Sequence, residues 1–436
     1  MHRERPVNRA ETRLDHVTPY DRFAWSDVEI EHLLTTGAHQ RDLIAYFGAQ
    51  EYLELAALAR KAAETVTADA PKVFVVPGIM GSQLGLRRTA PLPNDILWLD
   101  PIDIELGRLS ALRVPGTAPI VSLGAMLWSY LRTKLHLRAA GFAAVFHDYD
   151  WRLGVDELGR ALAERLRAEA PNPVMIVAHS LGGLVARAAL RTAPMAHVSR
   201  VVLLGVPNFG SFAPVQALRG TYAVVRKLAR LVKTDTAEVL ARDVFNTFPS
   251  LYHMIPHASR HGGPDLFDAS QWPQSDPRPR AELLAAARTL PSALAPADER
   301  FSVIVGVGQE TVTAVSRRND EFVYTITRRG DGTVPAISAQ LPGANTYYAR
   351  TAHSDLTREP AVATAVIDLL RKGSTRRLSD KWAGKSLARA RITDQTLRLT
   401  HVEKVDWAHM EPEERRVFLQ NLNEPPELRL RVPKAR

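Results

Sequence analysis

The chain has 436 residues, of which 45% are apolar and 24% are charged, and its formal net charge is +9. These ordinary values for a folded protein exclude wholesale disorder, a collagen helix and a coiled coil. The chain contains no cysteine, which excludes a disulfide framework, a thiolate zinc site, an iron–sulfur centre and a cysteine nucleophile.

Residues 1–71 are predicted to form a helical appendage. Apolar residues recur at helical spacing over 26–66. Ser26 and Glu29 match a capping box, and Gly37 stands where the first helix would end.

From Lys72 onward, short β-branched runs alternate with helical segments. The predicted strands are 73–76, 143–146, 174–178, 201–205 and 302–307, and the predicted helices are 124–139, 156–170 and 181–191. Such alternation predicts an α/β fold with a doubly wound, mostly parallel sheet. We assign residues 72–207 and 301–373 to this core, and we expect the chemistry at the carboxyl ends of its strands.

Residues 208–300 interrupt the alternation, and an insertion of this length predicts a cap or lid. Within it, residues 224–233 carry an apolar stripe opposite a basic face, which is typical of a basic amphipathic helix. Such a helix either packs its apolar face on the body of the protein or contacts a membrane.

Residues 374–436 form a predicted basic C-terminal extension, with strand-like pieces at 397–405 and 426–432. The extension holds 14 Lys and Arg residues against 9 Asp and Glu residues. A solvated basic surface is the simpler interpretation, and contact with an anionic membrane surface is the alternative. No zinc-finger, RNP or helix-turn-helix motif accompanies the charge, so we expect no nucleic-acid partner.

The apolar pattern also bears on where in the cell the protein is expected. The first 25 residues lack the apolar stretch of a secretory signal, and no run approaches the ~18 residues that span a bilayer. Since the lack of cysteine also suits a reducing compartment, we expect a cytoplasmic protein, with peripheral membrane contact as a further option.

The segment VMIVAHSLGGLVAR places Ser180 between an apolar strand and a helix. This is the pattern of a nucleophile elbow, a sharp turn that lifts a serine hydroxyl above the sheet edge. The positions two before and two after the serine must be small to avoid backbone collisions, and Ala178 and Gly182 are small. A serine that only caps the helix is the alternative, which the strand context disfavours. His179, one position off, is predicted to be a packed histidine that points away from the hydroxyl.

A serine hydroxyl becomes nucleophilic when an imidazole removes its proton and a carboxylate orients that imidazole. Both partners are expected after the serine, in the order acid and then histidine. Asp331 stands in a Gly-Asp-Gly turn after the strand-like FVYTIT, and His353 follows the strand-like NTYYA. Taken singly, each has a plainer interpretation, a turn aspartate and a helix-entry histidine. Asp355 is an alternative acid that lacks the turn context.

The reaction also needs two donors for the oxyanion of a tetrahedral intermediate. The first predicted strand ends in a turn, PGIMGS, that is placed to aim the Ile79 backbone N–H at the site. The Leu181 N–H opens the helix after the serine and is the predicted second donor. The plainer interpretation of PGIMGS is a simple connecting turn.

Several of these motifs together resemble the lecithin:cholesterol acyltransferase-like branch of the α/β-hydrolase fold, which includes lysosomal phospholipase A2-type enzymes. The resemblance rests on PGIMGSQL, YDWRL, AHSLGG, FPSLYHMIP and GDGTVP and covers roughly residues 72–372. It implies a catalytic triad of Ser180, Asp331 and His353, and an acyl-enzyme formed from a lipid or another ester.

The resemblance also implies a lid. The LWLDP segment around Trp98 is similar to the family's lid tryptophan region near the acyl site, and Met80 and Phe209 are further candidates for substrate or lid contact. Because the chain has no cysteine, it lacks the disulfide that holds this lid in secreted members.

The combined expectation is a cofactor-free serine esterase or lipase that acts on carboxylic esters, with lipid esters favoured. The alternatives are a lipid O-acyltransferase of the same mechanism and a non-catalytic hydrolase-fold binding module. His257 and His261 have i,i+4 spacing but no accompanying carboxylate motif, so no metal site is expected. The acyl chain, the acceptor and the oligomeric state stay open.

Overall fold

The computed structural model describes residues 18, 20, 21, 25–192, 195–384, 390–399 and 403–422. Its centre is a parallel sheet with the strand order β11-β8-β7-β6-β1-β5. The strands are β1 (Lys72–Val76), β5 (Ala143–Phe146), β6 (Val174–His179), β7 (Val198–Leu204), β8 (Phe301–Gly306) and β11 (Asn345–Ala349). The five core strands predicted from the sequence, the last of them at 302–307, are all present. The predicted doubly wound α/β fold is therefore confirmed.

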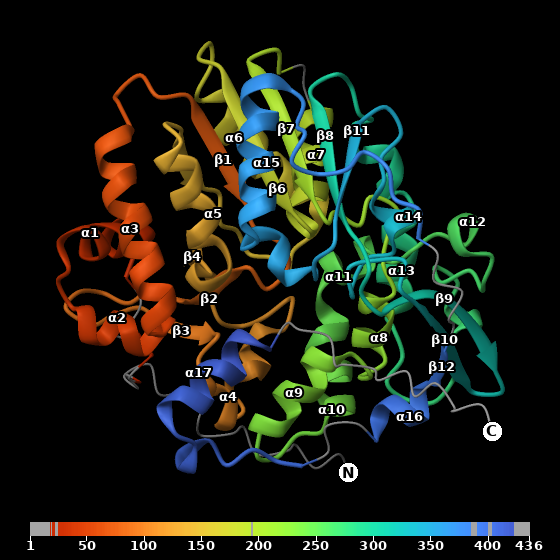
Figure 1. The fold of residues 1–436 in the computed structure, drawn as a ribbon. Coiled ribbons are helices and arrows are strands. Elements are labelled where there is room, and N and C mark those ends of the chain that lie inside the picture. The colour runs from red at the N-terminus through yellow and green to blue at the C-terminus, as the bar shows by residue number, and fades with distance from the viewer. Residues whose placement is uncertain are drawn as a thin grey trace, which may run out of the picture.

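Helices cover both faces of this sheet, as the alternating pattern predicts. In Figure 1, α5 (Leu127–Ala139) and α15 (Pro360–Lys372) lie in front of the sheet, and α6 (Val155–Arg167) and α7 (Leu181–Thr192) lie behind it. The helix predicted over 124–139 begins three residues late because β4 (Val121–Ala125) pairs with β2 (Ser82–Leu86).

Small sheets and helices lie beside the core. One antiparallel sheet joins β2 and β4 to β3 (Asp95–Trp98), and another joins β9 (Thr311–Arg318), β10 (Glu321–Thr327) and β12 (Ala390–Thr393). Further short helices are α4 (Pro101–Glu105), α14 (Ala336–Ala339), α16 (Asp394–Arg398) and α17 (Pro412–Gln420).

The helices α1 (Asp27–Thr36), α2 (Gln40–Phe47) and α3 (Ala49–Thr65) precede β1. The predicted capping box of Ser26 and Glu29 is confirmed, and Gly37 ends α1 in the left-handed conformation. Ion pairs hold these helices on α5, because Arg132 of α5 lies 2.5 Å from Glu51 and 2.6 Å from Glu54 of α3.

The insertion after β7 lies at the carboxyl ends of the strands (Figure 1). It contains α8 (Ala213–Leu218), α9 (Ala223–Leu231), α10 (Ala237–Asp243), α11 (Pro249–His253), α12 (Ala258–His261) and α13 (Ala281–Ala287). The predicted amphipathic helix is α9, and its apolar side chains Val224, Val225 and Leu228 are buried in the core. The apolar face of α9 therefore packs on the body of the protein. Among the described residues, no helix has both the length and the apolar character needed to cross a membrane.

One prediction for the C-terminal extension is wrong. The piece expected to be strand-like from 397 is helical up to Arg398, in α16. Thr393 caps α16 by accepting a hydrogen bond from the Thr396 backbone N–H, which starts a helix where the apolar pattern alone favours a strand. The other predicted piece, 426–432, lies outside the described residues.

The close contact between α6 and α7 yields a stability prediction. A methyl group built on Gly159 would lie 2.5 Å from the Ala188 Cβ. We expect Gly159→Val to lower the free energy of unfolding by about 1–3 kcal/mol, because the two helices must separate. Ala161→Val, at an exposed position of the same helix, should cost only about 0.5 kcal/mol through helix propensity. Urea unfolding of both variants measures the difference, and equal losses would contradict the packing argument.

Candidate active site

Ser180 stands on the sharp turn that joins β6 to α7. Its φ is 52°, in the left-handed region that residues other than glycine rarely adopt. Its backbone N–H donates a hydrogen bond to the Leu204 carbonyl at 2.9 Å, which holds the turn against β7. A methyl group on Gly182 would lie 2.3 Å from the Pro77 carbonyl oxygen. The predicted need for a small residue at that position is therefore confirmed.

The structure brings the predicted serine, histidine and aspartate together. His353 Nε2 lies 3.0 Å from Ser180 Oγ, and His353 Nδ1 lies 2.8 Å from Asp331 Oδ2. The other carboxylate oxygen, Oδ1, accepts the backbone N–H groups of Thr333 at 2.9 Å and Val334 at 2.7 Å. These bonds fix the carboxylate so that Oδ2 faces the imidazole. The imidazole faces Asp331 and not the alternative acid Asp355.

Two glycines at strand ends make room for this pair, and the sequence reasoning missed both. A methyl group on Gly306, at the end of β8, would lie 2.5 Å from the Asp331 Cβ. One on Gly205, just after β7, would lie 3.1 Å from both Asp331 Oδ2 and His353 Nδ1. A side chain at 306 would displace Asp331, and one at 205 would collide with Leu356 at 2.6 Å and crowd both the carboxylate and the imidazole.

The turn after β1 approaches Ser180 closely. A methyl group on Gly78 would lie 2.8 Å from the Ser180 Cβ. The backbone N–H groups of Ile79 and Leu181 have no hydrogen-bond partner among the residues that the structure describes. Ile79 also lines the cavity above Ser180.

A chain of hydrogen bonds connects this turn to His353 through Tyr130 and His179. The Gly78 backbone N–H donates to the Tyr130 hydroxyl at 2.8 Å, and this hydroxyl lies 2.9 Å from His179 Nδ1. His179 Nε2 lies 3.0 Å from the His353 carbonyl oxygen. Because a carbonyl only accepts, Nε2 carries the proton, and Nδ1 accepts from the hydroxyl.

His179 is neutral in this chain. Burial, together with the neighbouring His353 imidazole, lowers the pKa of His179 well below its ordinary value. The buried position of His179 agrees with the prediction of a packed histidine. Tyr130 was not predicted, since helical spacing does not tell which side of α5 meets the turn.

A cavity lies above Ser180 between the core and the insertion. Core elements contribute Ile79, Met80, Trp128, Tyr130, His179 and His353. The insertion contributes mostly apolar side chains, among them Pro214, Ala217, Tyr222, Val224, Leu251 and Met254. The cavity wall is thus largely apolar close to the serine hydroxyl.

The three predicted substrate or lid residues fall in different places. Met80 lines the cavity, whereas Trp98 and Phe209 do not. Trp98 is buried, its ring centroid lies 5.2 Å from that of Trp151, and its indole N–H donates to the Met80 carbonyl at 3.2 Å. Phe209 packs under the Arg260 guanidinium at 3.7 Å. Trp98 therefore supports the turn from behind, and Trp128 is the tryptophan that reaches the cavity.

The histidines considered for a metal have aromatic partners. The His257 ring centroid lies 4.5 Å from that of Phe267, and the His261 centroid lies 5.2 Å from that of Phe212. Within the described part of the chain, no group of three or more His, Cys, Asp or Glu side chains is placed to hold a metal ion.

Several solved structures are similar to this chain at low sequence identity. The mature Bacillus licheniformis lipase BlEst2 is 14% identical, and the match covers 72% of this chain and 95% of that chain at a TM-score of 0.38. The Tle4–Tli4 complex is 14% identical over 71% of this chain and 100% of that chain, at a TM-score of 0.43. A metagenomic carboxyl esterase is 13% identical over 72% and 73% of the two chains, at a TM-score of 0.32.

No curated protein matches the sequence. The family model of lecithin:cholesterol acyltransferase matches residues 139–368. This segment includes Ser180, Asp331 and His353 and spans just over half of the chain. The protein therefore belongs to the lecithin:cholesterol acyltransferase family.

Proposed function

We propose that the protein is a serine esterase or lipase that cleaves carboxylic esters through an acyl-enzyme on Ser180. The observation that carries the proposal is the continuous chain from Ser180 Oγ through the His353 imidazole to the Asp331 carboxylate, at 3.0 Å and 2.8 Å. Membership of the family supports an activity of the hydrolase or acyltransferase type on lipid esters.

In the first step, Ser180 Oγ attacks the ester carbonyl carbon while His353 Nε2 takes the hydroxyl proton. Asp331 stabilises the imidazolium and holds its ring in place. The oxyanion accepts hydrogen bonds from the Ile79 and Leu181 N–H groups. The intermediate collapses, the alcohol leaves with the proton from His353, and the acyl group stays on Ser180.

In the second step, His353 removes a proton from water, and the hydroxide attacks the acyl carbon. Collapse of this intermediate releases the carboxylic acid and returns the proton to Ser180. An apolar cavity suits the hydrocarbon part of the substrate, since burying each methylene group gains about 0.8 kcal/mol.

The second candidate is an O-acyltransferase, in which an alcohol replaces water in the second step. The apolar surroundings of Ser180, which disfavour water near the acyl group, are the observation that favours it. Incubation with an ester and an added long-chain alcohol separates the two. A new ester as main product supports acyl transfer, and free acid supports hydrolysis.

Replacement of the nucleophile tests the mechanism. We expect Ser180→Ala to lower ester turnover by about 10⁴-fold or more, because the remaining groups only bind and polarise the ester. A fluorophosphonate probe should label the wild-type protein and not the variant, and Ser292→Ala, an exposed serine, should leave both readouts unchanged. Undiminished turnover in Ser180→Ala would overturn the assignment.

The Tyr130 hydroxyl is predicted to position the turn and the base. Tyr130→Phe leaves the Gly78 N–H without its acceptor and His179 Nδ1 without its donor. We expect kcat to fall by about tenfold, as for a lost hydrogen bond of ~1–2 kcal/mol, with KM little changed. Tyr52→Phe, a buried tyrosine of α3, is the matched control. A rise in KM at unchanged kcat would contradict this role, because it would show that Tyr130 contributes equally to binding of the ground state and the transition state.

A further inference from the structure

The C-terminal strap, defined here as residues 390–399 and 403–422, lies outside the family match. Its first part is fixed to the core by pairing. Strand β12 runs antiparallel to β10, with Thr393 opposite Val323 and Ala390 opposite Ile326. The pairing places Asp394, the next residue, at the edge of the insertion.

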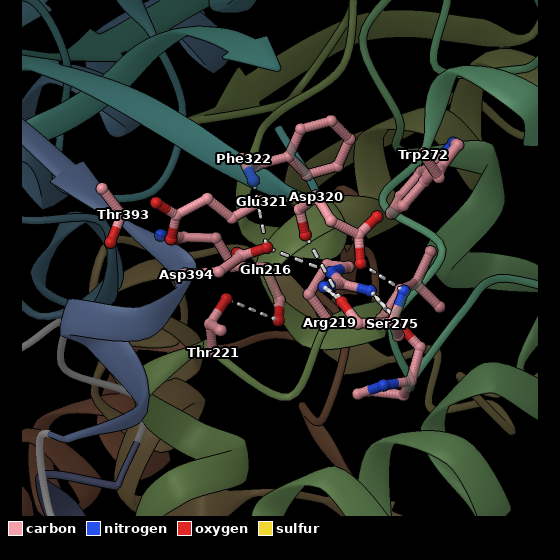
Figure 2. Close-up of polar contacts among 12 residues, drawn as sticks. Gln216, Arg219, Thr221, Trp272, Ser275, Asp320, Glu321, Phe322, Thr393 and Asp394 are labelled. Carbon is pink, nitrogen blue, oxygen red and sulfur yellow. Dashed lines mark hydrogen bonds and ion pairs between the residues drawn. The ribbon is translucent and has the colours of Figure 1, made fainter. Parts of the chain in front are cut away.

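A buried ion pair anchors the strap to the insertion. Figure 2 shows Asp394 facing Arg219, the residue that follows α8. Asp394 Oδ2 lies 3.2 Å from Arg219 Nε, and both side chains are at most 1% exposed. Asp394 also accepts the Tyr324 hydroxyl at 2.8 Å and the Phe322 backbone N–H at 3.2 Å.

Arg219 is satisfied on its other side as well. Its guanidinium donates to the carbonyls of Ser275 and Pro277, both at 2.6 Å. Removing one partner of such a buried pair typically costs about 3–5 kcal/mol, because the remaining charge is left without compensation. The anchor therefore holds the start of the strap in one position.

The strap then crosses the C-terminal end of α9. The Lys404 ammonium group donates to the carbonyls of Ala229 at 2.7 Å, Val232 at 2.7 Å and Asp235 at 3.0 Å. The last carbonyls of a helix have no partner within it, and Lys404 supplies one. A backbone bond from the Val405 N–H to the Arg230 carbonyl, at 2.9 Å, runs beside it.

The basic face of α9 bonds to the strap. Arg226 donates to the Arg398 carbonyl, Arg230 Nε donates to the Glu403 carbonyl at 2.8 Å, and Lys227 Nζ donates to the Asn421 carbonyl at 2.6 Å. The cations that made α9 a candidate for membrane contact therefore have acceptors within this chain.

The strap ends at the cavity above Ser180. Gln420, the last residue of α17, lines that cavity together with Trp128 and Arg358. Leu419 and Leu422 on either side of Gln420 are 5% and 1% exposed. Arg416 Nη1 donates to the Gln420 side-chain oxygen at 3.1 Å, which holds the amide in place.

We propose that α17 forms one wall of the substrate cavity and that Gln420 contacts the substrate, so that the strap limits the size of the esters that fit. The inference rests on the proposed ester-cleaving function of Ser180. It assigns a specificity role to a segment that the family match does not include.

The test uses the absence of cysteine from the chain. In Gln420→Cys, the introduced thiol is the only one, and alkyl methanethiosulfonates attach groups of increasing size to it. The matched control is Val417→Cys, on the same helix, where the side chain is 41% exposed and does not line the cavity. Both variants should unfold at the wild-type temperature before labelling.

We expect a decyl group at position 420 to lower turnover of a long-chain p-nitrophenyl ester by about tenfold or more, since overfilling a pocket of fixed shape excludes substrate. A methyl group should have little effect, and a decyl group at position 417 should have none. A labelled Gln420→Cys protein with full turnover of long-chain esters would overturn the proposal.

A second readout does not depend on catalysis. A non-hydrolysable ether analogue of the long-chain ester should slow labelling of Cys at 420, measured by mass spectrometry, and leave labelling at 417 unchanged. If the analogue protects Cys at 420 but the wild-type protein turns over no ester, the proposed function is refuted and the proposal that α17 forms a cavity wall stands. Turnover without protection would refute the cavity wall and keep the function, and the absence of both would refute both.

Discussion

The close approach of the backbone at the ends of β1 and β6 is the constraint on which the site depends. A methyl group on Gly78 would collide with Ser180, and one on Gly182 would collide with the Pro77 carbonyl. Both positions need glycine, because a larger residue at either one would keep the two turns apart. This approach brings the turn after β1, which contains Ile79, close to Ser180. A residue such as Ser180 that adopts a positive φ typically costs about 1–3 kcal/mol of folding free energy. The packed strand and helix on either side of the turn hold Ser180 in this conformation.

A second imidazole, that of His179, lies beside the imidazole of His353. The ring centroids of His179 and His353 lie 4.7 Å apart. Two positive charges at that distance would repel strongly in a buried site. A neutral His179, with Tyr130 donating to Nδ1, instead offers its Nε2 proton to the His353 carbonyl. It orients the backbone of the base and adds no charge that would oppose the imidazolium formed during the proposed reaction.

The core was predictable because buried parallel strands leave a local signal, a short β-branched run between helical segments. The order of Ser180, Asp331 and His353 along the chain was also readable, since each follows a strand-like run. Ser180 and His353 follow β6 and β11 of the central sheet, whereas Asp331 follows β10 of a small antiparallel sheet. The glycines at 205 and 306 carry no comparable signal, because their role appears only when two strands of the sheet bring the pair against them. The family resemblance pointed to Trp98 as the lid tryptophan. Trp128 was not predictable in this way, because only the packing of α5 shows which of its sides faces the cavity.

The C-terminal extension shows the limit of local patterns most clearly. Its basic excess favours a solvated or membrane-facing surface when the sequence is considered alone. In the structure, carbonyl oxygens of the strap accept from the cations of α9, and Lys404 of the strap binds carbonyls at the end of α9. A lysine that donates to three carbonyls needs no carboxylate partner, so charge counting does not reveal it. Asp394, Lys404 and Asn421 bond to the insertion at successive points, and Gln420 lines the cavity beside side chains of the insertion. A segment that the family match does not reach therefore borders the cavity above Ser180.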